Sequence, residues 1–288
     1  ADIISMPKYR TGILEHMARS GAAAYISLGD WPYCDKPWEQ RASTIDEFRK
    51  CHLTSRVIPQ VRSLTSKMGI YGIYDDHEIR NDFDQRIRDK SPSLSGAGLN
   101  AWDEFFPMQG KVRYRSWRWG QLLEFFLLDL RSYRTSYKAP DGPGKTMMGA
   151  EQKRWLLDGL AASKASFRVV ISSVPLGFGT TKEHWNAFPS ERAELMKALM
   201  TRPKSTVVLT ADQHWFAAHH HKGGLREFQV GPVMAFTRPP GPKAPEVVAR
   251  SVEPNFGELR ATPGSPNRLV FVCRDKQGKP IYSETLQA

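Results

Sequence analysis

The chain has 288 residues and is 40% hydrophobic, which is enough for one large α/β domain or two small ones with a sizeable core. No run approaches the ~18 apolar residues that a membrane span requires, so a transmembrane segment is not expected. The formal net charge of +11 favours anionic partners such as phosphates, although a basic surface also serves solubility.

Hydrophobic periodicity predicts alternating helices and strands along the first two thirds of the chain. Helices are expected over residues 9–20, 149–163 and 190–200, and strands over residues 22–28, 68–74, 122–130, 168–173 and 206–210. From about residue 205 the pattern becomes strand-rich, with strands expected over residues 216–221, 225–230 and 268–274. This order predicts an α/β fold, in one domain that covers residues 1–288.

Acidic residues and histidines follow three of the predicted strands directly. Asp30 comes after the first strand, Asp76 and His77 after the second, and Asp212 and His214 after the strand over residues 206–210. In open α/β sheets, ligands bind beyond the carboxyl ends of the strands. The sequence therefore predicts a functional site where these three strand ends meet.

The residue types at this site suit a pair of metal ions. A dinuclear hydrolytic centre uses carboxylates and imidazoles from separate strand ends, with one carboxylate shared between cations. Asp30 is the natural bridging ligand, and Tyr33 could add a phenolate, which suits trivalent iron. Asp76 would bind the second metal, whereas His77 is better used as a donor to phosphoryl oxygens or to the leaving group.

Asp212 and His214 are spaced as alternate residues of a strand. If the strand continues through them, both side chains project to one side and one can serve each metal. Each motif alone is weak, because Gly-Asp turns are common and an Asp-x-His pair is often structural. The alternative is that these residues are capped strand ends whose polar groups are satisfied within the protein.

Six segments together resemble one known family, the PhoD-type alkaline phosphatases, a branch of the calcineurin-like metallophosphoesterases. The segments are LGDWPY (28–33), YDDHEIRND (74–82), DLRSYR (129–134), MGAEQKRWL (148–156), TADQH (210–214) and EFQVGP (227–232). The resemblance implies a four-layer αββα sandwich. It also implies hydrolysis of phosphomonoesters or phosphodiesters through a metal-bound hydroxide at a dinuclear or larger centre.

The same resemblance implies a ligand set. Members use iron(III) with calcium, although other divalent metals are possible at such ligands. Carried over by position, Asp30, Tyr33 and His214 would hold iron, and Asp30, Asp76 and Asp212 would hold calcium. His77 matches the histidine that contacts phosphate, as catalytic and substrate-binding residue.

Some family features are not expected within residues 1–288. The family's cysteine ligand for iron, in an SCQ motif, aligns about two residues before Ala1, so the identity of the metal stays open. The family's N-terminal β domain is also not expected here. The first residue is Ala1 rather than Met, which fits a processed export precursor but equally fits a sequence that lacks its first residues; a secreted or periplasmic location is the expectation. Oligomeric state is not predicted.

Several other residues could belong to the site but also have plausible structural roles. Arg131 could bind substrate phosphate, but an ion pair with Asp129 or Glu78 is the alternative. His219, His220 and His221 lie on a predicted strand that turns alternate residues to opposite faces, so none is expected to bind metal. Cys34 and Cys51 could form a disulfide, although nothing in the sequence supports the bridge.

Competing functions remain within and outside the enzyme class. Within it, a phospholipase D-type phosphodiesterase would act on lipids or teichoic-acid-like polymers. Outside it, a non-catalytic relative would bind polyanions. No stable nucleic-acid partner is expected because no long Lys/Arg block is present, and steep salt dependence of DNA binding would indicate the contrary.

Overall fold

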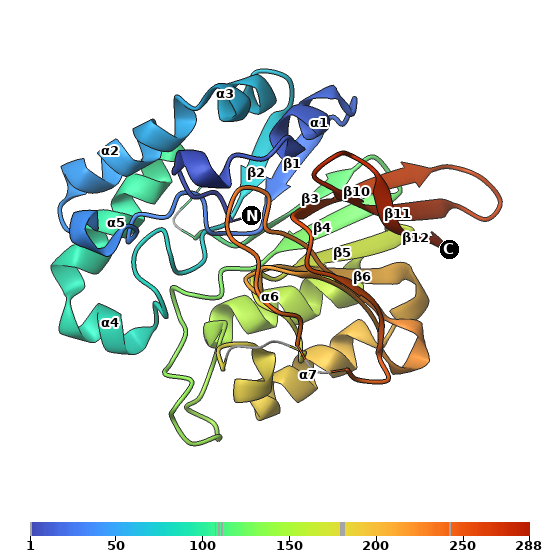
Figure 1. Ribbon diagram of the computed structural model, residues 1–288. Coiled ribbons are helices and arrows are strands. Elements are labelled where there is room, and N and C mark those ends of the chain that lie inside the picture. The colour runs from blue at the N-terminus through green and yellow to red at the C-terminus, as the bar shows by residue number, and fades with distance from the viewer. Residues whose placement is uncertain (1, 107, 109, 111, 179–181, 242) are drawn as a thin grey trace.

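The computed structural model describes residues 2–106, 108, 110, 112–178, 182–241 and 243–288 (Figure 1). Its α-helices are α1 (Ile13–Arg19), α2 (Ile45–Arg56), α3 (Pro59–Thr65), α4 (Gln85–Lys90), α5 (Pro92–Phe105), α6 (Gly149–Ala162) and α7 (Pro189–Leu199). Its strands are β1 (Ala24–Ser27), β2 (Gly69–Gly72), β3 (Arg115–Trp119), β4 (Leu123–Leu127), β5 (Phe167–Ile171), β6 (Thr206–Thr210), β7 (Phe216–His220), β8 (Arg226–Gln229), β9 (Val247–Ser251), β10 (Asn255–Thr262), β11 (Arg268–Asp275) and β12 (Pro280–Gln287).

The largest sheet has the strand order β3-β4-β5-β6-β8-β7-β9. Its central strands β4, β5, β6 and β8 are parallel, and the outer strands pair antiparallel. Every residue of β5 and of β6 is buried, as expected for parallel strands covered on both faces. Helices α6 and α7 lie along one face of this sheet (Figure 1).

The opposite face of the large sheet packs against two smaller sheets. One is the parallel pair β1-β2, and the other is the antiparallel sheet β10-β11-β12. Helices α1, α2, α3 and α5 lie beyond the β1-β2 pair (Figure 1). The four-layer αββα sandwich predicted from the sequence is therefore confirmed.

Two separate hydrophobic cores hold these layers together. The first fills the space between the sheets and beneath α1, α2 and α3, and includes Tyr25, Val169 and Phe271. The second lies between the large sheet and the helices α6 and α7, and includes Leu160 and Val208. Alternate residues of β5 and β6 point into one core or the other, because strand side chains alternate between faces.

Cys34, Cys51 and Cys273 are all free, so Cys34 and Cys51 do not form a bridge. Among the helices of the described residues, none is long and apolar enough to cross a membrane.

The stack of Phe271 on Phe228 joins β11 of the small sheet to β8 of the large one. The ring centroids are 3.8 Å apart with an interplanar angle of 1°, and both side chains are buried. We expect Phe271→Ala to lower the free energy of unfolding by about 3 kcal/mol, because it removes buried surface and leaves a cavity. Urea denaturation would measure the loss. Val248→Ala, at a side chain 49% exposed on β9, is the matched control and should change stability by less than about 0.5 kcal/mol.

Candidate metal centre

The carboxyl ends of β1, β2 and β6 meet at one edge of the sandwich. Asp30 follows β1, Asp76 follows β2, and Asp212 follows β6. The turn after β1 approaches the turn after β2 closely at Gly29, where an added Cβ would lie 2.6 Å from the Cβ of Asp75. Gly29 also has φ +105°, a conformation that favours glycine. This close approach brings the first two acidic clusters together.

Tyr33 lies at the centre of the first half of the site. Its phenol oxygen is 3.0 Å from Asp30 Oδ2 and 3.0 Å from His214 Nε2. His214 Nδ1 donates to the carbonyl of Phe236 at 2.6 Å, which leaves Nε2 directed at the site. Burial lowers the pKa of the His214 imidazole, and a neutral imidazole is the form that binds metals. Burial and then Asp30 raise the pKa of the Tyr33 phenol, so without a cation it stays protonated.

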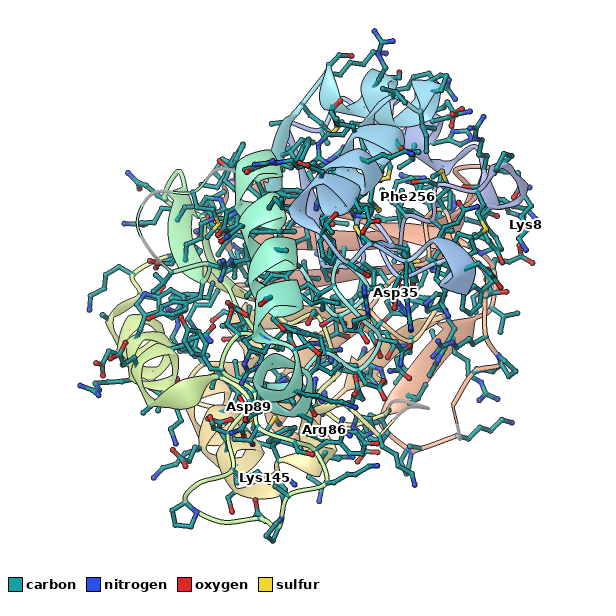
Figure 2. The ribbon with its side chains drawn as sticks, turned by 90° about the vertical axis from the view of Figure 1, so that its left-hand side faces the viewer. Lys8, Asp35, Arg86, Asp89, Lys145 and Phe256 are labelled. Carbon is teal, nitrogen blue, oxygen red and sulfur yellow. The ribbon has the colours of Figure 1, made fainter. Side chains whose placement is uncertain are left out.

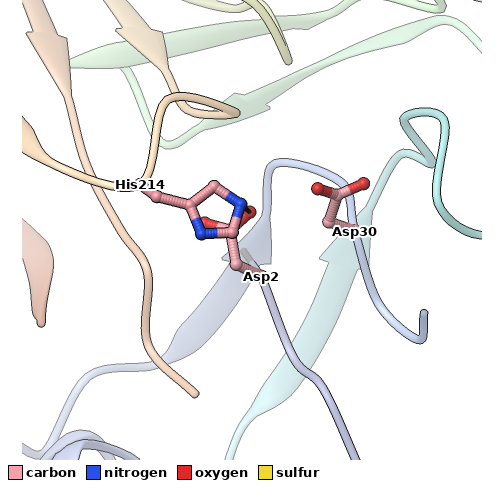
Figure 3. A group of neighbouring side chains, drawn as sticks. All are labelled: Asp2, Asp30 and His214. Carbon is pink, nitrogen blue, oxygen red and sulfur yellow. Dashed lines mark ion pairs between the residues drawn. The ribbon is translucent and has the colours of Figure 1, made fainter. Parts of the chain in front are cut away.

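Asp2 joins the same cluster, although the sequence analysis did not select it. Its Oδ1 is 3.5 Å from the Tyr33 phenol oxygen and 3.5 Å from His214 Nε2. Figure 3 shows Asp2, Asp30 and His214 converging from three separate segments of chain. Ligand atoms of these three residues all lie within 4.8 Å of one another, which is close enough to share one metal ion.

The second half of the site is made of carboxylates from two turns. Asp75, Asp76 and Asp212 place one oxygen each within 4.8 Å of the others, and Asp30 forms a similar group with Asp76 and His77. Burial and then neighbouring carboxylates raise the pKa of Asp30 and of Asp212 well above the usual range. Burial acts in the same direction on Asp76, but Arg131 and His77 outweigh it and lower the pKa of Asp76 to about 2.

His77 is held in one orientation by a buried acid. Its Nδ1 lies 2.8 and 2.9 Å from the two carboxylate oxygens of Asp35, and its ring stacks on Tyr33 with centroids 4.1 Å apart. In Figure 2 Asp35 lies inside the molecule, in contrast to the exposed Lys8 at the rim. Although burial lowers it, Asp76 and Asp35 together raise the pKa of His77 to about 9. Because Nδ1 contacts Asp35, Nε2 is the ring nitrogen that can donate a hydrogen bond to a substrate.

Arg131 is fully buried beside the carboxylates. Its guanidinium makes a bidentate contact with Asp75 at 2.7 and 2.9 Å and a further contact with Glu183 at 2.8 Å. Its backbone amide donates to Asp129, but its side chain pairs with neither Asp129 nor Glu78. The structure thus places Arg131 in an ion pair, as the alternative interpretation held, but with different partners.

Backbone conformation marks the site independently of its chemistry. Asp2, Asp30, Asp82, Asp212 and His214 have φ between 59° and 70°, and all other residues with positive φ in the described chain are glycines. Such conformations cost energy for residues with a Cβ and tend to cluster at functional sites. The turn at Asp212 and His214 also means that β6 ends at Thr210, as its predicted bounds had it, so the strand does not continue through these two residues and the alternation expected in that case does not apply.

The structure brings seven of the candidate residues into one region, namely Asp30, Tyr33, Asp76, His77, Asp212, His214 and Arg131. Ligand groups in the described residues do not include His219, His220 or His221, which instead contact Phe178, Glu284 and Glu227. Sequence reasoning missed Asp2, Asp35 and Glu183. None of these three lies in an Asp-x-His motif or directly after a predicted strand. Asp35 lies only five residues after Asp30, however, and could have been considered.

The donors fit hard cations. The carboxylate oxygens Asp2 Oδ2, Asp76 Oδ1 and Glu183 Oε1 are buried without a hydrogen-bond partner. Buried polar atoms are nearly always satisfied, so such oxygens indicate a missing partner. Carboxylate and phenol oxygens with an imidazole suit iron, manganese or calcium rather than a soft metal.

Comparison with known proteins agrees with this geometry. A model of the PhoD-like phosphatase family matches residues 6–263. The chain is 24% identical over 247 residues to alkaline phosphatase D of Bacillus subtilis (strain 168); the match covers 69% of this chain but only 42% of that relative.

Two solved structures share the fold. A structure of PhoD aligns with a TM-score of 0.80 at 18% identity and covers all of this chain and 72% of that one. A dimetal phosphatase from Danio rerio aligns with a TM-score of 0.57 at 13% identity, covering 95% of this chain and 86% of that one. The family model spans most of the sequence, and the chain belongs to the PhoD-like phosphatase family.

Proposed function

We propose that the chain is a metal-dependent phosphoesterase that hydrolyses phosphomonoesters, phosphodiesters or both. One observation carries the proposal: Asp30 shares a ligand group with Asp2 and His214 and another with Asp76 and His77. A carboxylate common to two adjoining groups is the arrangement that bridges two cations. Family membership and the phosphatase names of the relatives support the same reaction.

Each half of the site suits a different cation. We assign iron(III) to Asp30, Tyr33 and His214, because a phenolate suits a trivalent ion, and calcium to Asp30, Asp76 and Asp212, because carboxylates suit calcium. Other divalent metals could replace either. When bound, the cations supply Lewis acidity toward phosphoryl oxygens and lower the pKa of water.

The side chains around the cations have separate tasks. His77 donates from Nε2 to the phosphoryl or departing oxygen, and Asp35 holds the ring in the orientation that this requires. We assign Arg131 a positioning role, because its nitrogens already contact Asp75 and Glu183 and its side chain is fully buried. The half-buried Asp212 marks the side from which a substrate reaches the cations.

We also propose a secreted or periplasmic location and a single domain over residues 1–288. Fractionation of the producing cells would test the location. The preference between monoesters and diesters is decided by the first experiment below.

The metal-loaded protein should hydrolyse p-nitrophenyl phosphate, bis-p-nitrophenyl phosphate or both, and the ratio of kcat/KM values gives the preference. We expect His77→Asn to lower kcat by about 10²- to 10⁴-fold, the usual range for loss of a general acid, with metal content unchanged. His16→Asn on α1 is the matched control and should retain full activity. Absence of turnover on both esters by the loaded wild type would refute the proposed function.

The role of Asp35 can be separated from a general effect on folding. Asp35→Asn should lower kcat less than His77→Asn does, because the ring remains but is held less firmly. In the His77→Asn background the same change should have little further effect, since Asp35 acts through His77. A double-mutant cycle in kcat measures this coupling. Full additivity of the two losses would contradict the assignment.

Removal of a site carboxylate should have opposite effects with and without cations. We expect Asp212→Asn to raise the melting temperature of the chelator-treated protein, because it relieves repulsion with Asp75 and Asp76. The same variant should gain less stability when Ca²⁺ or Mn²⁺ is added, whereas wild type at about 100 times the Kd should gain about 2.7 kcal/mol. Differential scanning calorimetry measures both. Asp158→Asn, exposed on α6, is the control and should behave as wild type.

A further inference from the structure

We infer that Asp2 supplies a carboxylate ligand to the cation beside Tyr33 and His214. This half of the site then offers a second carboxylate beside that of Asp30, together with the phenol of Tyr33 and the imidazole of His214. The inference rests on the proposed function, because it concerns a ligand of the same centre. It goes beyond the ligand set that the family resemblance implies, where a cysteine contributes to this metal.

The position of Asp2 satisfies the geometry for a ligand. Its side chain is fully buried, and Oδ1 faces both the phenol oxygen of Tyr33 and Nε2 of His214 at 3.5 Å. The second oxygen, Oδ2, is buried without a hydrogen-bond partner. A buried and unpartnered carboxylate oxygen in a group of ligands is explained by a cation at that place.

Neighbouring backbone holds Asp2 in this place. The amide of Ile3 donates to the carbonyl of Asp30 at 2.8 Å, and the amide of Met234 donates to the carbonyl of Asp2 at 3.1 Å. The loop that contains Met234 also contains Phe236, whose carbonyl orients His214. Asp2 is therefore attached on one side to the turn that carries Asp30 and on the other to the loop that positions His214.

A simple ion pair between Asp2 and His214 does not explain this arrangement. Where the protein pairs an acid with a histidine, as with Asp35 and His77, the atoms approach to 2.8 Å. Asp2 and His214 stay 3.5 Å apart, beyond the usual hydrogen-bond distance. His214 has already committed Nδ1 to Phe236, so its remaining nitrogen faces the same point as the carboxylate. Side chains that point at one place without hydrogen bonding to each other have the geometry of ligands around a shared ion.

A carboxylate in this place changes the chemistry of the half-site. Thiolates prefer soft or borderline metals, whereas carboxylates prefer hard ones such as iron(III), manganese and calcium. The described cysteines are not among the candidate ligand groups, and Cys51 instead donates to the carbonyl of Tyr33. Thiol-directed reagents should consequently leave the metal in place.

Cobalt(II) titration of the full chain tests the assignment, because a thiolate bound to Co²⁺ adds intense near-ultraviolet charge-transfer absorption. Wild type should bind about two Co²⁺ per chain without this absorption. Asp2→Asn, which is similar in shape and tolerates the positive φ, should weaken one of the two sites by at least about tenfold. Asp2→Cys should bind Co²⁺ and gain the thiolate absorption, whereas Ser20→Cys at the end of α1 should not.

The outcomes separate this inference from the proposed function. If wild type binds Co²⁺ at both sites and Asp2→Asn binds it equally well, Asp2 is not a ligand, although the phosphoesterase proposal stands. Absence of the absorption band in a folded, Co²⁺-loaded Asp2→Cys protein would overturn the inference in the same way. If wild type binds no Co²⁺, Mn²⁺ or Ca²⁺, both the inference and the metal-dependent function are overturned. Circular dichroism spectra that match wild type establish that each variant is folded.

Discussion

Repulsion among buried carboxylates is the constraint on which the site depends. Asp2, Asp30, Asp75, Asp76 and Glu183 are all buried in one region, and Asp212 lies beside them. Arg131 neutralises part of this charge through Asp75 and Glu183, whereas among the described residues no lysine or arginine forms an ion pair with Asp2 or Asp30. Burial of an ionised carboxylate is costly unless it is paired or coordinates a metal. The protein therefore needs cations at this place, or it must keep some of these groups protonated.

The fold makes such a concentration of charge possible. Parallel strands deliver their carboxyl ends to one edge, so residues distant in sequence converge without long side chains. The large sheet between two hydrophobic cores keeps these ends fixed, and the contacts of Asp35 with His77 and of Phe236 with His214 orient the imidazoles. The first core extends to the residues that flank the site, so the packed scaffold holds the like charges together.

The sequence predicted those helices and strands whose hydrophobic residues recur at the period of the element and are buried in the structure. The fully buried β5 and β6 and the amphipathic α6 were predicted within a few residues of their observed bounds. Helix α2 was missed because it is mostly polar and only its capping box, Thr44 with Glu47, marks it. Helix α5 was missed because it contains two glycines, and β12 because polar residues interrupt its apolar alternation.

The candidate site was predictable where its acidic residues directly follow strands, and less so elsewhere. Asp30, Asp76 and Asp212 each follow an apolar run, so they could be found without a structure. Asp2 lies outside any predicted strand, and Glu183 reaches the site from a loop far from the other motifs, so only tertiary contacts reveal them. The geometry of His214 also differs from the strand model, because a left-handed turn rather than strand alternation directs its side chain.

The left-handed backbone at the site restricts which residue types it can hold. Asp, Asn, His and Gly tolerate positive φ best, and three of these types carry oxygen or nitrogen donors. At Asp2, Asp30, Asp82, Asp212 and His214, backbone shape and ligand chemistry thus favour the same small set of amino acids. Alanine scanning at these positions would mix backbone strain with the loss of the donor. Exchange of Asp for Asn adds no backbone strain to that already present, so its effects can be attributed to charge and coordination.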